Sequence, residues 1–137
     1  MEWFLLAIVA LVGFTGLFLL IRKITDLGVR SDVLLLYYFG LAALILLIYT
    51  VFMKTNLGIT KYAFLLLLVT AILGVVANIF LVQSIKISPN PGYALAVSGV
   101  HILLVAFASI FIFKSEFTLM KGIGTVLAVL GIILLGL

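Results

Sequence analysis

The chain has 137 residues, of which 67% are hydrophobic and only 9% are charged. A soluble domain has roughly a quarter of its residues charged, so this composition excludes a soluble globular protein and predicts one surrounded mostly by lipid. The lack of Cys excludes disulfides and thiolate chemistry, and the single His excludes a metal site built from imidazoles. The eight Lys and Arg residues are scattered between apolar runs, so we expect no nucleic-acid partner.

Five apolar stretches are long enough to cross a bilayer, since a helix rises about 1.5 Å per residue and about 20 residues cross the hydrocarbon core. In chain order they cover residues 3–21, 33–53, 62–85, 93–113 and 119–137. The first is not expected to be a signal peptide, because Glu2 stands where a cationic segment would be and the apolar run is too long. The links are too short to separate domains. We therefore predict an all-α integral membrane protein with residues 1–137 as one five-helix transmembrane domain.

Polar residues and prolines mark the expected helix starts, because a short side-chain oxygen accepts from the unpaired amides of a first turn. The clearest interruption is the segment 88–92, in which Asn90 is the expected N-cap and Pro91 the first helical residue. The other expected start signals are Ser31 or Asp32 for the second helix, Asn56, Gly58 and Thr60 for the third, and Thr118 for the fifth.

Basic residues divide equally between the two membrane faces if the chain crosses five times. One face has Lys54, Lys61, Lys114 and Lys121, and the other has Arg22, Lys23, Arg30 and Lys86. An excess of Lys and Arg on the cytoplasmic side normally sets orientation, so this tie predicts dual topology, with copies inserted both ways. The alternative is that the tie arose by chance, as about one case in four would, and that Arg22 and Lys23 beside the first helix decide the orientation.

The last two predicted helices carry a recognisable order of polar residues. The third helix leads into 88–91, the fourth ends in 111–116 with acidic Glu116, and Thr118 opens a fifth helix with recurring Gly. This order resembles the C-terminal half of an EamA domain, the five-helix repeat of the drug/metabolite transporter superfamily. The chain departs from that pattern in a link one residue shorter around Glu116, and in lacking a proline often found within the fourth helix, near Leu103 here.

The resemblance implies both an architecture and a function. Most members of the superfamily resemble ten-helix proteins made of two inverted repeats, and this chain is similar to one repeat. It therefore implies an antiparallel ten-helix homodimer with a polar cavity formed by first, third and fourth helices. The implied function is a secondary transporter moving a small metabolite or amphipathic compound by alternating access, without a cofactor. We expect a multi-pass protein of a prokaryotic cell (inner) membrane, with lipid, a second copy and a small-molecule substrate as partners.

Few polar residues fall inside the predicted helices, and unpaired polar groups in lipid are functional candidates by default. The predicted substrate-binding residues are His101, Asn78, Ser98 and Thr15. His101 lies within about 3 Å of the midplane if 93–113 spans symmetrically. A neutral imidazole and a carboxamide suit an uncharged or zwitterionic solute. The alternatives are interhelical hydrogen bonds for His101 and Asn78, and bonds to their own helix carbonyls for Thr15 and Ser98.

Acidic residues are missing from the interior of every predicted helix. Glu2, Asp26, Asp32 and Glu116 all lie at ends or links. The small multidrug resistance family is similar in size but depends on a Glu in its first helix, and nothing corresponds here. We therefore expect no carboxylate proton coupling, which leaves His101 as a proton carrier or else facilitated diffusion.

Two other observations complete the sequence predictions. Gly124, Ala128 and Gly131 form a small-residue stripe in the fifth helix, which predicts either the dimer contact or packing within the protomer. No constellation of nucleophile, base and metal ligands exists, so we expect neither an enzyme nor a metal site. The alternatives to a metabolite transporter are a non-transporting membrane assembly or stabilising protein and a component of a lipid-carrier flippase.

Overall fold

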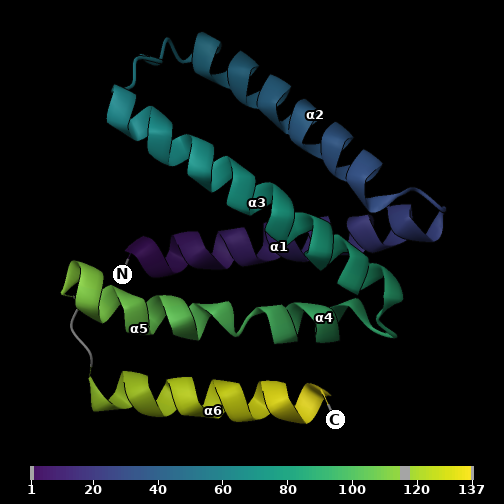
Figure 1. Ribbon diagram of the computed structural model, residues 1–137, viewed down its shortest axis with the longest axis vertical. Helices are drawn as coiled ribbons and strands as arrows, with labels where there is room; N and C mark the ends of the chain where they lie inside the picture. The colour runs from purple at the N-terminus through teal and green to yellow at the C-terminus, as the bar shows by residue number, and fades with distance from the viewer. Residues whose placement is uncertain (1, 115–117, 137) are drawn as a thin grey trace. The chain divides into compact units, whose positions relative to one another are not determined.

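The computed structural model describes residues 2–114 and 118–136, with the side chains of all of these except 2, 3, 121, 133, 135 and 136. Every regular element in this part of the chain is a helix (Figure 1). The helices are α1 (Glu2–Asp26), α2 (Ser31–Phe52), α3 (Lys61–Ile87), α4 (Pro91–Ser98), α5 (His101–Phe113) and α6 (Leu119–Gly136). They form two compact units, Met1–Lys86 and Ile87–Leu137.

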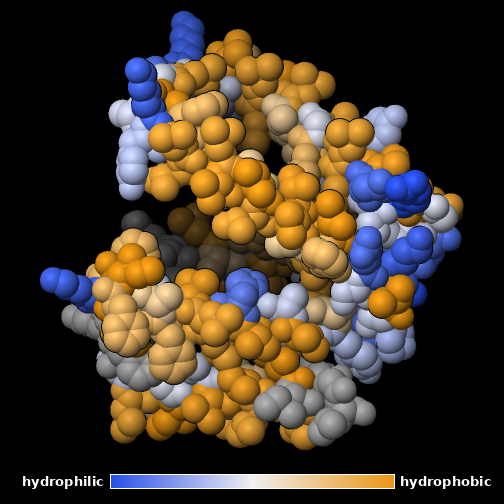
Figure 2. All heavy atoms as spheres, viewed as in Figure 1, coloured by the Kyte–Doolittle hydropathy of each residue, from blue (hydrophilic) through white to orange (hydrophobic). Residues whose placement is uncertain are grey.

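Within the described residues, four segments are long and apolar enough to cross a membrane, namely Phe4–Asp26, Ser31–Phe52, Lys61–Ile87 and Pro91–Phe113. Apolar side chains cover most of the face seen in Figure 2, and large ones such as Leu36 and Leu104 are about 70% exposed, at 73% and 68%. Such exposure would be strongly unfavourable in water, because the hydrophobic effect scales with apolar area. The helices therefore have the surface of segments whose solvent is lipid.

The buried side chains of the first unit lie where its three helices meet. They are Ile21 and Thr25 of α1, Ser31, Leu34 and Leu35 of α2, and Val82 and Ile85 of α3. Figure 1 shows the end of α1, the start of α2 and the end of α3 converging at this place. The core of the unit is thus at one end of the helices, and their other ends are splayed apart.

Arg22 joins α1 to α3 within this core. Its Nη1 donates to the carbonyl oxygens of Ile85 at 2.6 Å and Lys86 at 3.2 Å. These carbonyls belong to the last turn of α3, where no helical amide is available to them. Nε of Arg22 also lies 3.1 Å from a carboxylate oxygen of Asp26, four residues later, and this pair extends α1 past its predicted end at residue 21.

The second helix begins differently from the prediction. We expected Ser31 or Asp32 as its cap, but Arg30 occupies the N-cap position and makes no side-chain cap bond. Asp32 is held instead by the Arg30 guanidinium, with Nη2 to Oδ2 at 2.7 Å, and accepts from the Val33 amide at 3.0 Å. Ser31 is buried. The ion pair therefore draws residues 31 and 32 into the first turn.

Two other predicted caps are confirmed. The Thr60 hydroxyl accepts from the Ala63 amide at 3.2 Å, directly before α3. Asn90 is the N-cap of α4, and its side-chain oxygen accepts from the Gly92 amide at 2.8 Å, with Pro91 as the first helical residue. Thr118 directly precedes α6, and its carbonyl accepts from the Gly122 amide at 3.0 Å.

In the second unit α6 packs against α4 and runs antiparallel to α4 and α5 (Figure 1). The continuous helix expected over 93–113 is divided, since α4 ends at Ser98 and α5 begins at His101. The fifth predicted helix corresponds to α6, which contains the apolar stretch Gly122–Ile132. Its expected end at residue 137, and Glu116 in the preceding link, lie outside the described residues.

Candidate functional site

The interruption between α4 and α5, residues 98–101, is a short tightening of the helix. The Val100 amide donates to the Val97 oxygen at 3.2 Å, three residues back, where a continuous α-helix would have it donate to Ala96. The Ile102 and Leu103 amides likewise donate three residues back, at 3.0 and 2.9 Å. This is the 3₁₀ pattern, which in mid-helix marks a hinge or a strained sequence. It deprives the Ala96 and Ser98 carbonyl oxygens of their α-helical amide donors.

His101 supplies the missing donor to one of these oxygens. Its Nδ1 lies 2.6 Å from the Ser98 carbonyl oxygen. A carbonyl oxygen only accepts, so Nδ1 carries the proton, and the Nε2 atom of the neutral ring is then an acceptor. The Ser98 hydroxyl donates to the Leu95 oxygen at 2.9 Å. The Nδ1 proton of His101 and the hydroxyl proton of Ser98 are therefore both donated to backbone oxygens.

Gly99 explains why the chain tightens at this point. A Cβ added to Gly99 would lie 3.1 Å from the Ala96 oxygen and 3.3 Å from the Leu95 oxygen, both of them backbone atoms. Both oxygens belong to the turn that precedes Gly99, and Gly99 itself has the helical backbone angles φ −60° and ψ −15°. Gly is less favourable than Ala in a helix by about 1 kcal/mol, which weakens the continuous helix at this point. Kinks concentrate at adjacent Gly and Ser residues, and Ser98 directly precedes Gly99. That pair was a signal for the interruption which the sequence analysis did not use.

The interruption lies at the centre of its membrane-length segment. Pro91–Phe113 has 23 residues, so Ile102 is its middle residue and His101 is next to it. The His101 side chain is exposed. Irregular backbone at this depth occurs in membrane proteins where it is buried in protein or lines a cavity, because lipid offers no hydrogen bonds. His101, Ser98 and the Ala96 carbonyl thus form a polar group at the middle of a segment long enough to cross a membrane.

The other two predicted site residues lie in the first unit. The Thr15 hydroxyl donates to the Leu11 oxygen at 2.8 Å, and Asn78 Nδ2 donates to the Gly74 oxygen at 2.8 Å. Thr15 is exposed and Asn78 is half-buried. Thr15 lies seven residues before Arg22, and Asn78 lies seven residues before Ile85, whose carbonyl oxygen accepts from Arg22. Seven residues are about two helical turns, so Thr15 and Asn78 are at a similar distance along their helices from the core of the unit. Of the four predicted residues, the structure brings Ser98 and His101 together.

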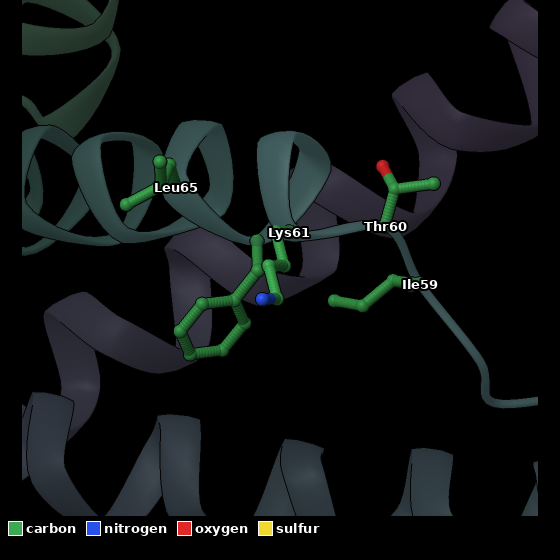
Figure 3. Close-up of a pocket in the computed structure, with 5 residues that line it drawn as sticks. Ile59, Thr60, Lys61 and Leu65 are labelled. Atoms are coloured by element: carbon green, nitrogen blue, oxygen red, sulfur yellow. The ribbon is translucent and has the colours of Figure 1, made fainter.

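A surface hollow occurs at the start of α3, and none of the four predicted residues lines it. It is lined by Ile59, Thr60, Lys61, Phe64 and Leu65 (Figure 3). These residues all come from one short stretch of chain. The hollow is therefore formed by the start of one helix and is not a cavity between helices. Among the described residues, no three His, Cys, Asp or Glu side chains gather in a way that would hold a metal ion.

The small-residue stripe of α6 is open within the second unit. A Cβ added to Gly124 or Gly131 would have no atom within 4 Å, and Ala128 is exposed.

Comparison with known families decides what kind of protein this is. The model of the EamA-like transporter family matches residues 1–137. The chain belongs to this family. Its helices, with α4 and α5 counted as one segment, correspond in number to a single five-helix EamA repeat, as the sequence predicted. The EamA chain is accordingly a multi-pass membrane protein of a transporter family. No curated protein and no solved structure shows significant similarity to it.

Proposed function

We propose that this EamA chain is a secondary transporter that moves a small metabolite by alternating access. The observation that carries the proposal is the interruption at the middle of Pro91–Phe113, where His101 and Ser98 reorganise the backbone bonds. Each backbone carbonyl oxygen that has no hydrogen-bond donor costs several kcal/mol of free energy in hydrocarbon. A site that binds a polar solute at mid-depth gives such groups a function.

We further propose that two copies assemble as an antiparallel homodimer of dual topology, each crossing five times, in the cell membrane of a prokaryote. The equal division of basic residues between the faces supports insertion both ways. The unpacked stripe of Gly124, Ala128 and Gly131 supports an association through α6. In such a pair the two-fold axis lies in the membrane plane, so His101 and its copy are at the same depth.

Release from liposomes tests the transport proposal. Liposomes with and without purified protein are loaded with one defined mixture of uncharged, zwitterionic, cationic and anionic metabolites, and the medium is sampled over time by mass spectrometry. We expect the protein to accelerate release of at least one metabolite. Release of none would contradict transport and favour the assembly or stabilising protein. Acceleration of lipid transfer between leaflets alone would favour the flippase component.

Orientation is tested separately, because the chain has no native Cys. Single Cys residues are placed at Leu27, in the link between α1 and α2, and at Leu57, between α2 and α3, both of which are well exposed at 76% and 61%. An impermeant thiol reagent applied to intact cells should label each variant partially. Complete labelling of one variant and none of the other would show a single orientation.

A further inference from the structure

The hydrogen-bond donors and acceptors that remain at the α4–α5 interruption indicate which kind of solute would bind there. His101 has one ring proton in its neutral form, and that proton is on the Ser98 oxygen. Ser98 has one hydroxyl proton, and that proton is on the Leu95 oxygen. These two side chains can therefore only accept further hydrogen bonds, through the lone pairs of His101 Nε2 and Ser98 Oγ.

The backbone contributes a further acceptor. The Ala96 oxygen loses the Val100 amide, which donates to Val97. Ala96 lies one turn before Gly99 and Val100 in the same segment, so this oxygen belongs to the interruption. Acceptors therefore outnumber donors among the groups that the interruption makes available.

Charged residues are absent from the neighbourhood of these acceptors along the chain. Between Pro91 and Phe113 the sequence has no Asp, Glu, Lys or Arg, and Lys114 is the first charged residue after it. An ion moved to the middle of this segment would have no counter-charge from it, and an uncompensated charge at that depth is costly. An uncharged solute has no such cost.

We propose that the interruption is the solute site of the carrier and that it selects an uncharged solute bearing hydroxyl or amide N–H donors, which bind His101 Nε2. This inference rests on the proposed transport function. It assigns two separate roles to one ring: Nδ1–H holds the Ser98 oxygen and so fixes the tautomer, and Nε2 receives the solute. The neutral ring is the binding form, because protonation would turn Nε2 into a donor.

The first test reads the tautomer without any solute. His101 is the only His in the chain, so ¹⁵N-histidine labelling of the full protein in lipid nanodiscs reports on one ring. We expect the N–H correlation to belong to Nδ1 at neutral pH. A proton on Nε2 would overturn the inference, since the ring would then be a donor to the solute.

The second test uses the liposome release assay with two matched variants. His101→Asn retains a nitrogen donor near the position of Nδ1 but has no acceptor at the position of Nε2. His101→Gln places an acceptor oxygen near the position of Nε2 but lacks the donor to Ser98. We expect wild type to release uncharged hydroxylated or amide solutes, with erythritol as the probe, ahead of choline and glutamate. His101→Asn should release erythritol about tenfold more slowly, the factor for one lost hydrogen bond, and His101→Gln should retain more.

The outcomes separate this inference from the proposed function. Faster release of choline or glutamate than of erythritol would leave transport standing and overturn the uncharged-solute assignment. A His101→Asn variant that is folded and dimeric like wild type and releases erythritol at the wild-type rate would overturn the role of Nε2. If wild type releases nothing from the whole metabolite mixture while the proton is found on Nδ1, transport fails and the assigned tautomer stands.

Discussion

Replacing Gly99 by Ala should straighten the segment formed by α4 and α5. Ala is favoured over Gly in a continuous α-helix, because Gly loses more backbone entropy when it becomes helical. The substitution therefore stabilises the continuous helix relative to the interrupted conformation.

The size of the effect follows from helix propensity. Ala is favoured over Gly by about 1 kcal/mol in a helix. A difference of about 1 kcal/mol moves the equilibrium by a factor of about 5 towards the continuous helix.

The single histidine again provides the measurement. In the continuous helix the Ile102 amide would return from the Gly99 oxygen to the Ser98 oxygen and displace Nδ1 of His101. We expect the Nδ1–H signal of the ¹⁵N-histidine spectrum to weaken in Gly99→Ala, and erythritol release to fall with it. Gly40→Ala is the control, because it makes the same change within α2 and leaves the interruption unaltered. A folded Gly99→Ala protein with the wild-type ring spectrum would refute the reasoning.

Three further substitutions test separate parts of the structure. Arg22→Gln should lower the free energy of unfolding by about 1.5–3 kcal/mol in a thermal or SDS titration, since it loses the bonds to the end of α3, and Arg22→Lys should lose less while keeping the topological charge. Asn90→Ala should cost about 1 kcal/mol in the same titration and Asn90→Asp much less, unless the cap of α4 is dispensable. Ala128→Leu should weaken chemical cross-linking of the dimer without unfolding the protomer, and unchanged cross-linking would exclude α6 from the contact.

The sequence predicts the helices of this chain well because lipid leaves few alternatives. In hydrocarbon each backbone amide must find a partner within its own segment, so a long apolar run becomes a helix almost regardless of its residues. Local chemistry predicts the caps at Thr60 and Asn90 for the same reason, since the donor and acceptor are neighbours in sequence. Asp32 was predicted wrongly because Arg30, two residues before it, competes for the carboxylate.

Contacts between helices were harder to predict. Arg22 was read only as a charge that orients the chain, and nothing in its neighbourhood indicates that it reaches the end of α3, 63 residues later. The interruption at Gly99 was missed for a different reason. The pattern of apolar residues continues through it without change, and the helical period says nothing about a shift from i−4 to i−3 bonds.

The interruption also bears on the proline that related sequences often have within the fourth helix and that this chain lacks. A proline removes one amide and forces its helix to bend. Gly99 achieves a related result without losing an amide, since the Val100 and Ile102 amides keep partners by shifting one residue. The difference matters for mechanism: a proline bend is permanent, whereas the Gly99 conformation differs from a continuous helix only by reversible hydrogen bonds. His101 then has a place in the exchange, because its bond to Ser98 exists only while the Ile102 amide is elsewhere. A solute that binds Nε2 would favour the interrupted conformation, and its release would allow the continuous one, so a single side chain can link solute binding to a change in helix geometry.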